Sequence, residues 1–143
     1  MTLVGLQHQP TKNAKLIKTD TPGYVEFLSK KYTSGKASTH LHSLQPGQFL
    51  SFYGPLKAYS WAPNKHSHIY LLAGGAGITP MYQLIQGALK DPDDKTKITL
   101  VFGVNTEEDL VLREELEGFR KRYPERFETV YTISDGKTEG KGF

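Results

Sequence analysis

The stretch from Leu71 to Met81, Leu-Leu-Ala-Gly-Gly-Ala-Gly-Ile-Thr-Pro-Met, decides the fold of this chain. A short apolar run, His68–Ala73, precedes the glycines and predicts a strand buried on both faces. A helical pattern follows from Pro80 to about Leu89, with Thr79 as its expected N-cap and Pro80 at its first position. Glycines let a ligand approach the backbone, and a helix N-terminus attracts anions. The stretch therefore predicts a site for a phosphate or pyrophosphate.

Three readings of this loop compete. A P-loop would need Gly-Lys-Ser/Thr at its end, and Ile78-Thr79-Pro80 does not supply it. The usual dinucleotide fingerprint is Gly-x-Gly-x-x-Gly, whereas Gly75 and Gly77 are followed here by Pro80. A turn that is rich in glycine for no functional reason remains the alternative to a nucleotide site.

The sequence after the loop continues the alternation of strands and helices. Ile98–Val104 is typical of another buried strand, and Phe127–Ile133 of a third. Between them, Thr106–Asp109 resembles a capping box, and a helix is expected to follow until Tyr123-Pro124. Its apolar face would carry Leu110, Leu112, Leu116 and Phe119. Strand–helix–strand–helix–strand predicts parallel pairing with right-handed crossovers, as in part of a doubly wound parallel sheet.

The sequence before the loop has a different character. Residues 1–23 show no period and are expected to be irregular. Residues 24–62 mix strand and turn patterns and predict part of an antiparallel β-barrel, and residues 63–143 form the partial α/β domain. The expected elements of the barrel part are strands at Tyr24–Lys31 and Gln48–Tyr53 and a short helix at Ala37–Leu41, with a linker at Trp61–His66.

Composition excludes several classes of function. The 143 residues contain no cysteine, which excludes a disulfide framework and thiolate metal sites. The net charge is +3, and basic and acidic residues are interspersed, so we expect no nucleic-acid partner. No apolar run approaches the roughly 20 residues of a membrane helix. The pairs His40/His42 and His66/His68 could suggest a metal, but without carboxylates nearby we expect solvated histidines and no metal site.

Four segments together resemble a known family. Leu71–Met81 is similar to the nicotinamide-binding motif of the ferredoxin–NADP reductase superfamily, and more closely to that of NADH–cytochrome b5 reductases. The segment Lys30–Leu41 resembles the flavin-diphosphate segment of that family, and Gly54-Pro55-Leu56 the end of its flavin barrel. Val101–Asp109 resembles the segment beside the adenosine ribose. Within this family, the amino-acid sequence of these segments is most similar to that of the fungal mitochondrial branch.

The resemblance implies a flavoenzyme with FAD and NADH as cofactors. NADH would deliver hydride to FAD, which would pass electrons to cytochrome b5 or a similar haem protein. Lys30 and Thr79 would be the catalytic residues at the flavin–nicotinamide junction. The implied FAD contacts are Lys30, Tyr32, Gly35, Lys36, Ala37, Ser38 and Thr79. The implied NADH contacts are Gly74, Gly75, Gly77, Ile78, Pro80, Thr106, Glu107 and Asp109.

The chain departs from the family pattern at several points. The flavin motif Arg-x-Tyr-Thr/Ser is absent, since no arginine precedes Arg113, and the late Cys-Gly-Pro segment is absent too. Ala37 replaces a usual methionine. Ser134 and Asp135 stand where an acidic residue often favours NADH over NADPH.

These departures leave two hypotheses for function. The first is an FAD-dependent NADH–cytochrome b5 reductase, shortened at both ends. The second is a non-catalytic remnant that binds pyridine nucleotide and does not retain flavin. For the first, the resemblance implies a monomer of a membrane-anchored family whose anchor is outside this chain. It also implies a mitochondrial place, at the outer membrane or in the intermembrane space, with the cytosolic face of the endoplasmic reticulum as the alternative.

Overall fold

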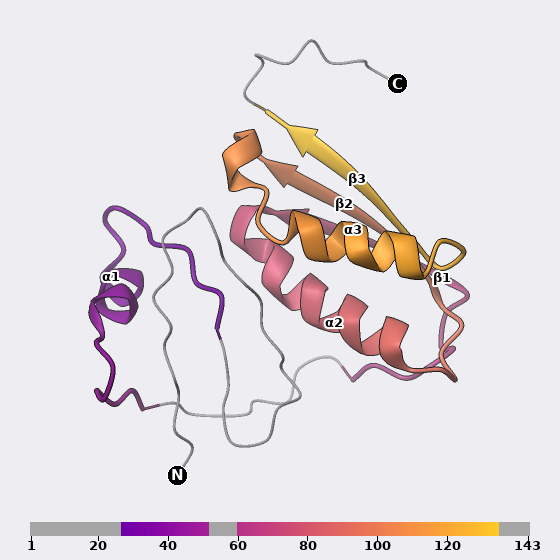
Figure 1. The fold of residues 1–143 in the computed structure, drawn as a ribbon, viewed down its shortest axis with the longest axis horizontal. Coiled ribbons are helices and arrows are strands. Elements are labelled where there is room, and N and C mark those ends of the chain that lie inside the picture. The colour runs from indigo at the N-terminus through magenta and orange to yellow at the C-terminus, as the bar shows by residue number, and fades with distance from the viewer. Residues whose placement is uncertain (1–26, 52–59, 135–143) are drawn as a thin grey trace. The chain divides into compact units, whose positions relative to one another are not determined.

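The computed structural model describes residues 27–51 and 60–134 (Figure 1). The chain divides into two compact units, Met1–Ala58 and Tyr59–Phe143, and each is described by itself. The expected irregular segment 1–23 lies outside the described residues. The boundaries drawn from sequence, after residues 23 and 62, stay predictions.

The first unit contains one helix among its described residues, α1 (Lys36–Ser43). It confirms the helical segment expected over Ala37–Leu41 and extends it at both ends. Residues 27–31 and 48–51, the described parts of the two expected strands, are not strands. Phe27 and Phe49 are 52% and 74% exposed, so neither segment lies on a buried sheet face. A strand needs a hydrogen-bonded neighbour, and none pairs with these described residues; the flavin barrel stays a prediction.

The second unit alternates strands and helices. Its elements are β1 (His68–Gly74), η1 (Gly75–Gly77), α2 (Ile78–Lys90), β2 (Lys97–Val104), η2 (Glu107–Asp109), α3 (Arg113–Arg122) and β3 (Phe127–Ile133), where η marks a short turn of 3-10 helix. The strands are parallel and lie in the order β1-β2-β3, which confirms the expected parallel sheet. Figure 1 shows α2 and α3 on the same face of that sheet. The loops to both helices therefore begin at one edge, at the carboxyl ends of the strands.

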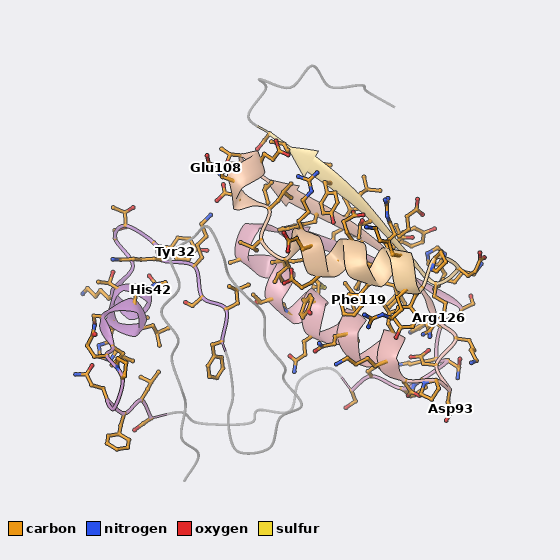
Figure 2. The ribbon with its side chains drawn as sticks, viewed as in Figure 1. Tyr32, His42, Asp93, Glu108, Phe119 and Arg126 are labelled. Atoms are coloured by element: carbon orange, nitrogen blue, oxygen red, sulfur yellow. The ribbon has the colours of Figure 1, made fainter. Side chains whose placement is uncertain are left out.

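The core lies between the sheet and the two helices. Ile98, Leu100 and Phe102 alternate along β2 and are at most 1% exposed. Phe119 of α3, labelled in Figure 2, packs against Phe127 of β3 with ring centroids 6.3 Å apart. Side chains of this kind each contribute about 1.5–3 kcal/mol when fully buried. This layer fixes the strand ends that position the loops.

The other face of the sheet is exposed at strand β1. Tyr70 and Leu72 on β1 are 67% and 74% exposed, so the expectation that His68–Ala73 is buried on both faces is wrong. The reason is positional: β1 is an edge strand of the described sheet, and the two helices of this unit, α2 and α3, lie on the opposite face (Figure 1). β2 lies in the centre and alternates between buried and half-buried residues. β3 has the bounds expected from sequence.

Two helix starts differ from expectation. α2 begins at Ile78, so Pro80 is its third residue rather than its first, a position where the missing N–H still costs nothing. The helix expected directly after Thr106–Asp109 is split into η2 and α3, because Leu112 adopts a left-handed conformation with φ +69°. Leu116 and Phe119 alone of the four expected face residues lie in α3. No helix within the described ranges has both the length and the apolar composition needed to cross a membrane.

Candidate nucleotide site

The glycine loop connects β1 to α2 through the single turn η1. Gly75 has φ +48°, a left-handed conformation that residues with a Cβ adopt at a cost. A Cβ placed on Gly74, Gly75 or Gly77 would meet no non-neighbouring atom of the described residues within 4 Å. Packing within the chain thus does not require small residues at these three positions. Their lack of side chains keeps space open beside the loop, which is the property that a close-lying ligand needs.

Thr79 does not cap α2 as expected. The N-cap is Gly77, which provides no side-chain hydrogen bond. The Thr79 hydroxyl donates to the carbonyl oxygen of Ala76 at 3.1 Å and so braces the glycine loop against the first turn. The backbone N–H of Ile78 also bonds within the loop, to the carbonyl oxygens of Ala76 and Gly75. The first turn of α2 is thereby fixed at the sheet edge, with its positive dipole end beside the open space.

A second group of expected residues follows β2. The hydroxyl of Thr106 lies 3.3 Å from the Oδ2 of Asp109, and the N–H of Asp109 donates to the Thr106 carbonyl at 3.1 Å. This is a 3-10 turn rather than the expected capping box, since the two side chains bond each other. Glu107 on the same turn pairs with Arg113 at 2.8 Å. Figure 2 labels Glu108 on this turn, beyond the end of β2.

The end of β3 lies next to this turn. The Ser134 hydroxyl is 3.2 Å from the carbonyl oxygen of Val104 and 3.3 Å from the Oδ1 of Asn105. Because Gly74 pairs with Gly103, and Gly103 with Thr132, the ends of all three strands reach the same edge. The glycine loop and the Thr106–Asp109 turn therefore share the edge where open α/β sheets bind nucleotides.

The expected flavin residues of the first unit form a tight local structure. The Ser38 hydroxyl accepts from the Tyr32 N–H and donates to the Gly35 carbonyl, both at 3.2 Å. A Cβ on Gly35 would lie 2.6 Å from the Ser38 oxygen and 3.0 Å from the Tyr32 Cβ, so a larger residue there would force these side chains to shift. Lys36, Ala37 and Ser38 form the first turn of α1, whose backbone N–H groups suit an anion. The Ser38 proton, however, is already used within the chain.

The two expected catalytic residues lie in different units. Lys30 is exposed and precedes the turn at Thr33-Ser34, and Thr79 is half-buried in α2. Tyr32, also expected at the flavin, is 53% exposed. The ring Nε2 of His42 lies 3.0 Å from the Ser29 carbonyl oxygen, which ties α1 to the preceding segment. Among the described residues, no three His, Asp or Glu side chains gather to hold a metal ion.

Sequence reasoning did not identify the contacts of Arg113, which pairs with Glu107 on the Thr106–Asp109 turn. The Arg113 guanidinium lies 5.9 Å from the ring centroid of Tyr131, which is on β3. Burial and then the charge of Glu117 raise the pKa of Tyr131, whose hydroxyl stays protonated and lies 3.4 Å from Glu117. No local pattern links these residues, so only the packing of α3 against β3 could have identified them.

A buried carboxylate outside the site was missed as well. Asp94 is 0% exposed and accepts hydrogen bonds from Trp61 Nε1 at 2.8 Å and from the Thr96 N–H at 2.9 Å. Burial alone would raise the pKa of Asp94, yet the bonds from Thr96, Trp61 and Asn64 outweigh it and lower that pKa. The sequence Asp91–Asp94 indicated only the end of a helix.

Two family models match this sequence. "Oxidoreductase NAD-binding domain" matches residues 71–143, more than half of the chain, and "Oxidoreductase FAD-binding domain" matches residues 11–61. The two models name FAD and NAD, the cofactors expected from sequence. Their order along the chain is also the expected one.

Curated relatives from fungi are similar over most of the chain. The NADH-cytochrome b5 reductase 2 of Aspergillus oryzae is 51% identical over 127 residues, which are 87% of this chain and 39% of the relative. The protein of the same name from Neurospora crassa is 52% identical over 120 residues, 84% of this chain and 35% of the relative. The chain thus spans about two fifths of the length of these relatives.

Two solved structures of cytochrome b5 reductase domains are also similar to this chain. The cytochrome b5 reductase domain of Ulva prolifera nitrate reductase is 35% identical with a TM-score of 0.66, over 69% of this chain and 42% of that one. The CS-b5R domains of human Ncb5or, in the NAD+ form, are 29% identical with a TM-score of 0.70, over 80% of this chain and 32% of that one. These likenesses agree with the parallel sheet described above.

Proposed function

We propose that this chain functions as an NADH-dependent flavin oxidoreductase, because it belongs to the family of oxidoreductases with FAD-binding and NAD-binding domains, which contains the NADH-cytochrome b5 reductases. In this proposal, residues 63–143 hold NADH, and residues 24–62 contribute to the hold on FAD. The relatives named above suggest cytochrome b5 or a similar haem protein as the electron acceptor.

The observation that carries the proposal is the open space beside Gly74, Gly75 and Gly77. At Gly74 and Gly77 the described residues leave room for a Cβ that neither position carries, whereas Gly75 needs glycine for its left-handed conformation. The dipole of α2 starts at the same point and favours a pyrophosphate there. A glycine-rich turn without a ligand would not need this combination.

The residues of the first unit fit FAD in part. The first turn of α1 offers backbone N–H groups from Lys36 and Ala37 to a diphosphate. Ser38 would have to release its bond to Gly35 before its hydroxyl could donate to a phosphate. When bound, FAD would supply a hydride acceptor that can release single electrons. The chain's own part is to hold the two cofactors and orient them, and we propose that Lys30 contacts the flavin and Thr79 the nicotinamide.

A direct test is the binding of ADP-ribose, the part of NADH without nicotinamide, to the purified 143-residue chain. We expect ADP-ribose to raise the melting temperature in a concentration-dependent manner. Inosine, which lacks the diphosphate, is the control and should leave the melting temperature unchanged. Equal and negligible shifts with both compounds would overturn the nucleotide site.

A second candidate function is pyridine-nucleotide binding without flavin. It is favoured by two observations: no arginine precedes Arg113, and the Ser38 proton is engaged. An arginine fork holds a diphosphate through charge-assisted bonds that a lysine does not reproduce. A visible spectrum after refolding with FAD separates the two candidates. Stoichiometric flavin that NADH bleaches would support the reductase, whereas flavin lost on gel filtration would support the second candidate.

The cellular setting follows from the same proposal. We propose a mitochondrial location at the outer membrane or in the intermembrane space, which rests on the fungal resemblance. Cell fractionation of the full-length protein tests it, since recovery with endoplasmic reticulum would favour the alternative. A monomeric state is proposed as well, and light scattering of the chain at two concentrations tests it.

A further inference from the structure

The Glu107–Arg113 ion pair is the strongest unassigned feature at the strand-end edge. Arg113 Nη1 and Glu107 Oε1 are 2.8 Å apart, and their side chains are 51% and 68% exposed. An exposed pair of this kind adds little to folding stability. A role in ligand recognition is therefore worth testing separately from a role in stability.

One backbone turn and two contacts determine where the Arg113 side chain lies. Leu112, with φ +69°, ends the segment after η2 and starts α3 at Arg113. The guanidinium lies over the Tyr131 ring at 5.9 Å. Glu107, on the turn that follows β2, pairs with the same guanidinium. Arg113 is thereby fixed at the edge where β2 and β3 end.

The charges around this position disfavour an additional anion. Glu107, Glu108 and Asp109 follow one another along η2, and the guanidinium of Arg113 already donates to Glu107. At the end of β3, Ser134 is neutral and its hydroxyl is directed to Val104 and Asn105. In dinucleotide sites an acidic residue accepts from the ribose 2′-hydroxyl, whereas a nearby arginine accommodates the 2′-phosphate of NADP. This chain has both residues, and they are paired with each other.

We propose that Glu107 sets the preference for NADH over NADPH by holding Arg113 away from a 2′-phosphate. This inference rests on the nucleotide site proposed above. Glu107 competes with the phosphate for the same guanidinium and repels the phosphate directly. Without the charge of Glu107, Arg113 could form charge-assisted bonds with a 2′-phosphate.

The test compares the binding of ADP and 2′-phospho-ADP to the 143-residue chain by titration calorimetry. Glu107→Gln should improve the affinity for 2′-phospho-ADP relative to ADP by about fivefold, the size expected for an exposed charge pair. Glu108→Gln is the matched control, because it removes the same charge one residue away, from a side chain that does not bond Arg113. It should change the ratio by less than about twofold, since solvent screens the remaining effect. The double variant Glu107→Gln/Arg113→Ala should lose the gain.

Each outcome has a distinct meaning. An equal gain in Glu107→Gln and Glu108→Gln would overturn the proposal, because net charge rather than Arg113 would then explain the preference. A gain that persists in the double variant would overturn it too, and so would an unchanged ratio in Glu107→Gln. If the unmodified chain binds neither nucleotide, the proposed nucleotide site itself fails. Circular dichroism and the melting temperature, expected to be unchanged for these exposed positions, verify that each variant is folded.

Discussion

Trp61 donates a 2.8 Å hydrogen bond from its indole nitrogen to the buried carboxylate of Asp94, 33 residues further along the chain. The same carboxylate accepts from the backbone N–H groups of Asn64 and Thr96 at 3.3 and 2.9 Å. Asn64 in turn accepts from the Lys95 N–H at 2.8 Å. These hydrogen bonds thus connect the segment before β1 to the loop before β2.

We predict that Asp94→Ala destabilises the second unit by about 2–3 kcal/mol, because it removes the acceptor of several buried or half-buried donors. Asp93→Ala is the matched control, since Asp93 is exposed and its side chain does not take part in the bonds described above. The control should change the free energy of unfolding by less than about 0.5 kcal/mol. Urea unfolding followed by circular dichroism measures both. Equal losses in the two variants would contradict this role of Asp94.

The same carboxylate predicts a pH dependence. The folded pKa of Asp94 lies below the ordinary value of 3.8, so its contribution is fully present above 3.8 and is lost as the pH falls through the folded pKa. The stability difference between the unmodified chain and Asp94→Asn should therefore be constant above about pH 5 and shrink below 3.8. Unfolding curves at several pH values check this. A difference that grows on acidification would have the wrong sign.

The glycine loop gives a prediction that separates folding from binding. Gly77 has φ −64° and open space around its Cβ position, so Gly77→Ala should change the stability by less than about 0.5 kcal/mol. It should nevertheless weaken the binding of ADP-ribose, because the new methyl group fills the space proposed for the nucleotide. Thermal unfolding and calorimetry on the same sample measure the two effects. Unchanged affinity would show that the ligand does not approach this position.

Gly75→Ala should behave differently from Gly77→Ala. Gly75 has φ +48°, and a Cβ in that conformation costs about 1–2 kcal/mol. We therefore expect a lower melting temperature even without a ligand. If Gly75→Ala were as stable as the unmodified chain, the loop would not need its left-handed residue.

The two faces of the sheet provide a test of the fold itself. Leu100 is 0% exposed beneath the helices, whereas Leu72 on the neighbouring strand is 74% exposed on the opposite face. Leu100→Ala should destabilise by about 2–5 kcal/mol through the cavity that it leaves, and Leu72→Ala by less than about 0.5 kcal/mol. Urea unfolding of both variants compares the same deletion at two sites. A larger loss at Leu72 would mean that its face is covered.

The sequence by itself determined the three strands, the intervening helices and the glycine loop of the second unit. Their signals are local: apolar runs of strand length, a helical period, and glycines between them. Phe127–Ile133 was predicted with the bounds that the structure has. The match in Leu71–Met81, together with the three further segments quoted above, also indicated the family.

Only the tertiary structure decided which side chains meet at the site. Arg113 reaches Glu107 because Leu112 turns the chain, and the sequence pattern there predicted an uninterrupted helix. The exposure of Tyr70 and Leu72 depends on strand order, which a short apolar run does not encode. The Trp61–Asp94 bond spans two distant loops. In each case the physical cause is a contact between residues far apart in sequence, and local periodicity carries no information about such contacts.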